Sequence, residues 1–278
     1  MMRHFTAKLL TIILISAVLF SLSCSASSNP PNHVPSPPTN SPNPPPDLPR
    51  AAIIDQLCVL QPNQTLLDQL TQELEDYGFE VDIYQGDEIT VDFYRSLAEP
   101  GYKLIIFRAH SGLLSGEGEV VNKTSLFTNE PYSETKHIKE QLSDQLAMAR
   151  IDKNHPYVFS IRDKFVTQSI KGKFNNTAII MMGCSCLFID DLAQAFIAKG
   201  ASVYLAWGAT VGLGYVDQAT IYLMKQLCQE KTTVKKAVSN TMTTIGPDPQ
   251  FGARLKYFPP QSSDKTLDVL LASQNLTS

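Results

Sequence analysis

Several features that mark whole classes of protein are missing from this sequence. The globular part carries no run of basic residues and the net charge is −4, which argues against nucleic acid as a partner. There is no CxxC pair, and the set of Cys184, Cys186 and His110 lacks a fourth ligand, so no metal site is expected. The glycine-rich stretch 112–118 lacks the Lys-Ser/Thr ending of a phosphate-binding loop. No internal repeat is visible, and no cofactor is expected.

A membrane-spanning run is also missing at the N-terminus. The apolar stretch from Leu9 to Leu22 is shorter than the ~20 residues that span a bilayer. It follows a basic start and precedes small residues, which is typical of an export signal over residues 1–24. Cys24 directly after this stretch favours lipoprotein processing with a lipid on Cys24. Simple signal cleavage and an uncleaved anchor are the alternatives.

The stretch that follows has almost no apolar side chains. Ten prolines lie between residues 27 and 50, together with Ser and Asn, and such a tract behaves as an extended spacer. We therefore expect a linker over 25–50 and one globular domain over 51–278. The expected location is the cell envelope, with the domain held off the membrane by a lipid anchor on the extracellular or periplasmic face.

Cysteine is sparse, with residues at 24, 58, 184, 186 and 228. An exported chain can form disulfides. A Cys58–Cys228 disulfide is one option, but the sequence does not establish it. Sequons begin at four asparagines and matter only if the host glycosylates exported proteins: Asn63, Asn122, Asn175 and Asn275.

Strand and helix patterns alternate through the domain. Strands are expected at 51–57, around 81–83, and at 103–109, 157–161, 178–183 and 202–207, with a strand or hairpin arm at 120–128. Helices are expected at 66–77, closed by Gly78, and at 91–97, 164–170, 192–199, from about 217, and from 234. Asp190 or Asp191 would cap the helix at 192–199. Two segments are expected to be less regular, a mobile loop at 112–118 and a helix or mobile segment at 134–150. The order predicts an α/β three-layer sandwich with a mostly parallel sheet.

Two of the predicted strands end in chemically reactive side chains. One apolar run, Lys103 to Ala109, ends at His110, and another, Ala178 to Gly183, ends at Cys184. Chemistry in an open α/β sheet lies beyond the carboxyl ends of the strands. These strands would therefore bring an imidazole and a thiol to one edge, where the histidine could act as acid or base. His137 and His155 lie in polar segments and are interpreted as surface residues.

These two strand ends resemble the caspase-like fold of cysteine peptidases, the group of caspases, gingipains, separases and CHAT domains. In that group one strand ends in His-Gly, and the next main strand ends in a small residue and the nucleophilic Cys. The matching stretches are IIFRAHSG at 105–112 and IIMMGC at 179–184. The helix LAQAFIAKGA at 192–201 and the strand VYLAWG at 203–208 resemble the elements that follow the Cys. The resemblance covers residues 101–245.

The resemblance implies a Cys/His dyad that cleaves peptide bonds, with Cys184 as nucleophile and His110 handling the proton on the leaving amine. Backbone N–H groups of Cys184 and of Ser111 or Gly112 would hold the oxyanion. Trp207 would help to shape the pocket for a substrate side chain. The expected partner is a peptide or protein substrate. Two departures are a Ser after His110 and a second thiol, Cys186, that competes as nucleophile.

Two other functions remain open at this point. A catalytically inactive relative would bind peptides or partners at the cell surface with the same fold. A flavodoxin-like or receiver-like sensor would need clustered acidic residues after the first strand, and Asp55 alone matches that poorly.

Overall fold

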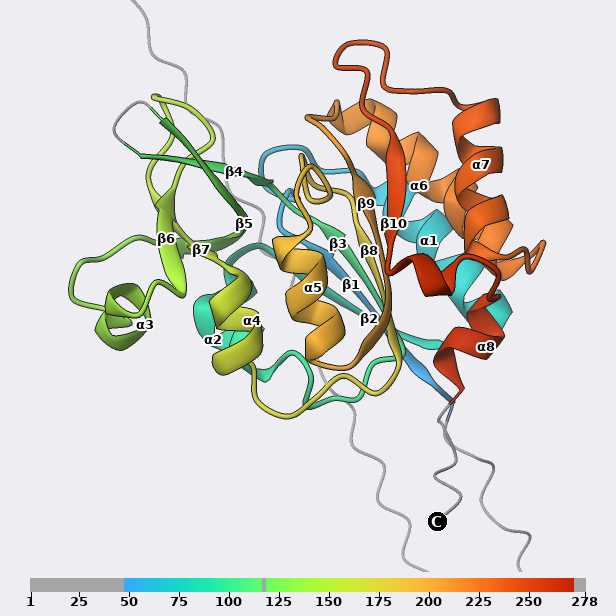
Figure 1. Ribbon diagram of the computed structural model, residues 1–278, viewed down its shortest axis with the longest axis horizontal. Helices are drawn as coiled ribbons and strands as arrows, with labels where there is room; N and C mark the ends of the chain where they lie inside the picture. Colours follow the sequence, from blue (N-terminus) through green and yellow to red (C-terminus); the bar gives the residue numbers. More distant parts are fainter. Residues whose placement is uncertain (1–47, 117–118, 273–278) are drawn as a thin grey trace, which may run out of the picture. The chain divides into compact units, whose positions relative to one another are not determined.

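A six-stranded sheet, sheet A, forms the centre of the protein (Figure 1). In the computed structural model, residues 48–116 and 119–272 are described. The predicted signal peptide, Cys24 and the linker before Leu48 lie outside them. The strand order is β10-β9-β8-β3-β1-β2. Their bounds are β1 (Arg50–Asp55), β2 (Glu80–Gln85), β3 (Leu104–Arg108), β8 (Thr177–Met181), β9 (Ala201–Trp207) and β10 (Leu255–Phe258).

Five of these strands are parallel, and β10 is an antiparallel edge strand. The central strands β3 and β8 are buried along their whole length, as their continuous apolar sequences predict. The five parallel strands lie where the sequence predicts them, within a few residues. β10 was not predicted, because the C-terminal stretch is polar and rich in proline.

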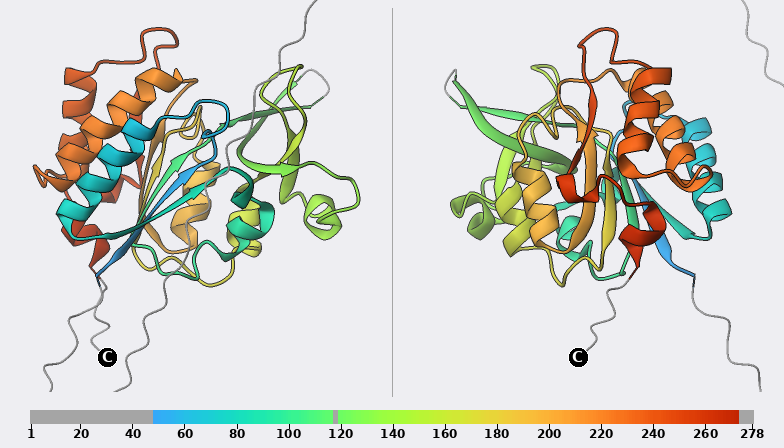
Figure 2. Two further views of the ribbon diagram at one scale, coloured as in Figure 1. Left: turned by 180° about the vertical axis from the view of Figure 1, so that it is seen from behind. Right: turned by 45° about the vertical axis from the view of Figure 1, so that its right-hand side comes forward.

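Helices cover both faces of sheet A (Figures 1 and 2). One face carries α1 (Gln64–Tyr77), α6 (Leu213–Cys228), α7 (Val234–Thr244) and α8 (Leu267–Leu271), and the other carries α2 (Val91–Ser96), α4 (Asp163–Gln168) and α5 (Asp191–Ala198). Each face has its own apolar core, because side chains alternate between the two faces along every strand. The predicted three-layer α/β sandwich with a mostly parallel sheet is confirmed.

The helix after β1 shows how local sequence sets the element bounds. The Asn63 side chain accepts a hydrogen bond from the Leu66 N–H at 3.1 Å and caps the helix. Leu66, Leu70 and Leu74 face the core. Gly78 ends the helix in a left-handed conformation, with φ of 108°, as predicted.

A second sheet, sheet B, corrects two predictions. Its order is β4-β5-β7-β6, all antiparallel, with β4 (Ser111–Gly116), β5 (Glu119–Pro131), β6 (Leu146–Ala149) and β7 (Val158–Ile161). Residues 112–116 of the stretch predicted as a mobile loop belong to β4, and residues 117–118 lie outside the described residues. The segment 134–150 contains only the short α3 (Ile138–Leu142) and then β6. Both predictions were wrong because pairing with β5 and β7 overrides weak local signals.

Short 3₁₀ turns occur at Gly86–Glu88 and Pro260–Ser262.

The cysteines of the described region are all free thiols, so no Cys58–Cys228 bridge is formed. Within residues 48–272, no helix that the structure describes has the length and apolar character needed to cross a membrane.

Candidate active site

β3 and β8 are adjacent parallel strands, and each is followed by one of the two predicted site residues. Phe107 lies opposite Met181, and the Met182 N–H donates to the Phe107 carbonyl at 2.8 Å. His110 lies two residues beyond β3, and Cys184 lies three residues beyond β8. Two adjacent parallel strands thus deliver an imidazole and a thiol to the carboxyl edge of sheet A.

Gly183 makes this close approach of the strand ends possible. A Cβ on Gly183 would lie 2.1 Å from the Ser111 hydroxyl and 2.7 Å from the Ala109 carbonyl oxygen. Only glycine fits here. This gives a physical reason for the small residue that precedes Cys184 in the sequence.

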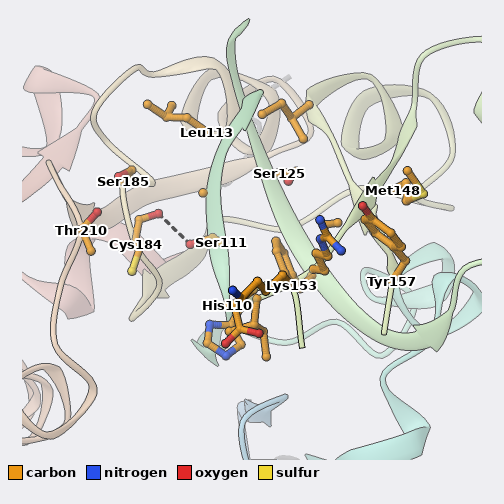
Figure 3. A pocket seen from close by; sticks show the side chains of 17 residues that line it. His110, Ser111, Leu113, Ser125, Met148, Lys153, Tyr157, Cys184, Ser185 and Thr210 are labelled. Carbon is orange, nitrogen blue, oxygen red and sulfur yellow. Dashed lines mark hydrogen bonds between the residues drawn. The ribbon is translucent and has the colours of Figure 1, made fainter. Parts of the chain in front are cut away.

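His110 and Cys184 both line one cavity of about 770 Å³ between the strand ends of sheet A and sheet B. Figure 3 shows Cys184 and Thr210 on one side of Ser111, with Ser125 and Tyr157 on the other. The cavity is lined by residues 110–114, Ser125, Phe127, residues 148–153, Tyr157, Cys184, Ser185 and Thr210. Small side chains from sheet B, including Gly112, Ser125 and Ala149, leave the space open.

The Ser111 hydroxyl forms hydrogen bonds with both cysteines of the sequence Cys184-Ser185-Cys186. The hydroxyl donates to the Cys184 carbonyl at 2.8 Å (Figure 3). It also accepts from the Cys186 thiol at 2.9 Å. Cys186 is fully buried and burial raises the pKa of its thiol to about 12. Cys184 is only partly buried and lines the cavity. The geometry therefore favours Cys184 over Cys186 as a reactive thiol.

The backbone around Cys184 is arranged in a tight turn. Ser185 has a φ of 56°, a left-handed conformation that is uncommon for a non-glycine residue, and its N–H donates to the Ala209 carbonyl at 2.9 Å. Within the described residues the Cys184 N–H has no hydrogen-bond acceptor. That N–H is available for the predicted oxyanion contact, whereas Gly112 is paired with Ser125 in the β4–β5 ladder.

Both members of the pair are uncharged near neutral pH. Burial raises the pKa of the Cys184 thiol, and the nearby Asp248 carboxylate raises it further. Burial also lowers the pKa of His110 to about 4, with the charge of His155 adding to the shift. The thiol donates to the Val211 carbonyl at 3.6 Å. Both shifts favour the neutral thiol and the neutral imidazole.

A side-chain network that the sequence did not reveal fixes the His110 backbone. The Gln56 side-chain oxygen accepts from the His110 N–H at 2.9 Å, and the Gln56 amide donates to Asn129 at 2.6 Å. The Asn129 amide in turn donates to the Gly86 carbonyl at 2.8 Å. The His110 ring packs against Phe127, with 5.8 Å between ring centroids. Three segments distant in the chain, at Gln56, Gly86 and residues 127–129, thereby position the His110 imidazole.

A buried ion cluster lies beneath the site. Arg108 is fully buried and pairs with Asp55 at 2.8 Å and with both carboxylate oxygens of Asp217 at 3.1 Å. Asn63 also donates to Asp217, at 2.8 Å. The cluster ties the ends of β1 and β3 to α6. Asp55, which alone matched the acidic pattern of a receiver domain poorly, is a member of this buried ion cluster.

Asp248 supports the loop that contacts Cys184. Its carboxylate accepts from the backbone N–H groups of Gly212, Gln250 and Phe251 at 2.7–2.8 Å. Burial opposes ionisation, but these three hydrogen bonds outweigh it and lower the pKa of Asp248. The loop is thereby held where the Val211 carbonyl meets the Cys184 thiol.

Several predicted roles are corrected. Trp207 is buried in the core against Tyr215, with 5.3 Å between ring centroids, and does not line the cavity. Asp190 precedes α5 without a capping hydrogen bond from its side chain. Asp191 does not cap the helix and accepts instead from the Thr124 N–H of β5 at 2.8 Å. The sequence could not show these long-range partners.

The two remaining described histidines are both paired. His137 is largely buried, 3.0 Å from a Glu130 carboxylate oxygen and edge-on to the Phe159 ring, so its interpretation as a surface residue was wrong. His155 is partly exposed, and its Nδ1 lies 2.9 Å from the Asp152 carboxylate. Among the described residues, no group of His, Cys, Asp and Glu could hold a metal ion.

No family model and no curated protein matches this chain.

Proposed function

We propose that this protein is a caspase-like cysteine peptidase whose nucleophile is Cys184 and whose acid and base is His110. One observation carries the proposal. The two residues follow the carboxyl ends of neighbouring parallel strands and both line one cavity, whereas the second thiol, Cys186, is buried. The chain order of β3, β8, α5 and β9 around them matches the order in the family that the sequence resembles.

The neutral pair defines how peptide cleavage would proceed. The Cys184 sulfur attacks the peptide carbonyl carbon while the thiol proton passes to the neutral His110 ring. The resulting imidazolium gives that proton to the amine nitrogen as the C–N bond breaks. Water, deprotonated by His110, then hydrolyses the thioester. The N–H groups of Cys184 and of Ser111 or Gly112 would stabilise the oxyanion in both steps.

The cellular setting is a second part of the proposal. The export signal, Cys24 and the proline-rich spacer favour a lipid-anchored protein that faces the outside of the membrane. Labelled fatty acid should be incorporated into the wild-type chain and not into Cys24→Ser. Soluble secretion of both forms would contradict the anchor.

A catalytically inactive binding module is the alternative, favoured by the absence of a resting thiolate. Cleavage distinguishes the two. The full-length protein should cleave members of a mixed peptide library, detected by mass spectrometry. Cys184→Ala and His110→Ala should lower the rate by about 1,000-fold or more, because both act in the same step.

The matched controls use the other thiols. Cys58→Ala and Cys186→Ala should retain cleavage, since neither thiol lines the cavity. A folded wild-type protein that cleaves nothing would support the binding module, and loss of cleavage only in Cys186→Ala would move the nucleophile to that residue.

The acid side of the pH profile should reflect the shifted histidine. Because catalysis needs neutral His110 and its pKa is lowered to about 4, kcat/KM should hold down to about pH 5 and fall near pH 4. His155→Asn removes a positive charge that favours the neutral ring, so the fall should move to higher pH. His137→Asn should leave it in place. An NMR titration of the His110 ring checks the same shift without activity, and a midpoint near 6.5 would contradict it.

A further inference from the structure

A small groove beside the main cavity is not used by the mechanism. It has a volume of about 200 Å³ and lies between the loop after β1 and the loop from β6 to β7. We call it the loop groove. It is lined by Gln56, Val59, Leu60, Asp87, Phe127, Asn129, residues 150–151, His155, Pro156 and Val158.

The loop groove is continuous with the cavity that holds the dyad. Phe127, Arg150 and Ile151 line both, and Phe127 packs against the His110 ring. Gln56, which holds the His110 backbone, also lines the groove. A peptide whose carbonyl reaches Cys184 would therefore pass close to the groove.

Three large, exposed aliphatic side chains line the groove. Val59 is 73% exposed, Leu60 47% and Ile151 40%. Such side chains, clustered from two separate loops beside a proposed active site, are typical of a binding surface. Burying one further aliphatic side chain against them would remove apolar area from water on both partners.

The polar groups in the groove are already paired within the protein. Gln56 bonds to the His110 backbone and to Asn129, and His155 bonds to Asp152. These groups do not need a polar ligand. Asp87 and Arg150, the two other charged residues of the lining, are exposed and remain solvated.

We infer that the loop groove is a subsite that takes one large aliphatic side chain, of leucine or isoleucine size, from the peptide substrate. The inference rests on the proposed function, since the peptide is placed by the dyad. The volume fits one side chain, because a cavity of about 150 Å³ holds a benzene-sized ligand. Cleavage would therefore be selective for substrates with such a residue near the cleaved bond.

The test uses acetylated tetrapeptide acyloxymethyl ketones, which alkylate a reactive cysteine and release a carboxylate. Leu, Ser and Asp are placed in turn at each peptide position, and Cys184 labelling in the full-length protein is followed by mass spectrometry. At one position Leu should label at least tenfold faster than Ser or Asp. Leu60→Asp and Ile151→Asp should remove that preference, whereas Val269→Asp on α8, which is 58% exposed and lies outside the groove, should keep it.

A second readout separates this inference from the proposed function. Methyl NMR signals of Leu60 and Ile151 should shift with unreactive Leu peptides and not with Ser peptides, even in Cys184→Ala. Such shifts without any labelling of wild-type Cys184 would keep the subsite and overturn the peptidase. Labelling at one rate for all probes, with no methyl shift, would overturn the subsite and keep the reactive cysteine.

Discussion

Gly183→Ala should lower peptide cleavage by about 100-fold or more and also destabilise the fold. The added methyl would lie 2.1 Å from the Ser111 hydroxyl and 2.7 Å from a backbone oxygen, so the ends of β3 and β8 must separate. Overpacking of this kind costs about 1–3 kcal/mol, and displacing a catalytic group by 1 Å costs about 100-fold in rate. Thermal unfolding and kcat/KM, measured on the same preparation, check both effects.

The control for this variant is Gly214→Ala. Gly214 lies in α6 and a Cβ there meets nothing within 4 Å, so alanine should be neutral or slightly stabilising. Wild-type cleavage by Gly183→Ala would show that the strand ends are not packed as described here.

Arg108→Ala should have the largest effect on stability. The substitution leaves the carboxylates of Asp55 and Asp217 without their buried partner. Removing one member of a buried ion pair costs about 3–5 kcal/mol, which approaches the total stability of many domains. Denaturant unfolding should show a strongly lowered midpoint or a chain that does not fold.

Arg50→Ala provides the matched comparison. Arg50 pairs with Asp82 while both remain partly exposed, so its loss should cost about 1 kcal/mol or less. Neutralising the cluster in Arg108→Met with Asp55→Asn and Asp217→Asn should recover part of the loss. Equal stability of Arg108→Ala and Arg50→Ala would contradict the role given to the buried cluster.

The central sheet could be predicted from the sequence because its strands carry strong local signals. The runs before His110 and Cys184 are continuous and apolar, and both form fully buried strands. Gly78 marks the end of α1 for the same kind of local reason. In sheet B, β5 and β7 match the strands expected at 120–128 and 157–161. β4 could not be predicted, because it is glycine-rich and is a strand only through pairing with β5.

The candidate site was predictable only in part. His110 and Cys184 stand at the ends of recognisable strands, so their positions follow from the sheet. Gln56 bonds to His110 across 54 residues of chain, and Asp248 bonds to Gly212 across 36 residues. No local sequence pattern predicts such contacts. The pKa shifts of His110 and Cys184 could not be predicted from the sequence either. Burial causes both shifts, and burial depends on the whole fold.

The most direct test of the central claim is to trap the thioester. The full-length protein is mixed with a cleaved peptide, quenched in acid within the first turnover, digested and analysed by mass spectrometry. We predict an adduct with the mass of the acyl half of the peptide on the fragment that contains Cys184, absent in Cys184→Ala. Cleavage without this adduct in wild type, or an adduct on Cys186 in its place, would contradict Cys184 as the nucleophile.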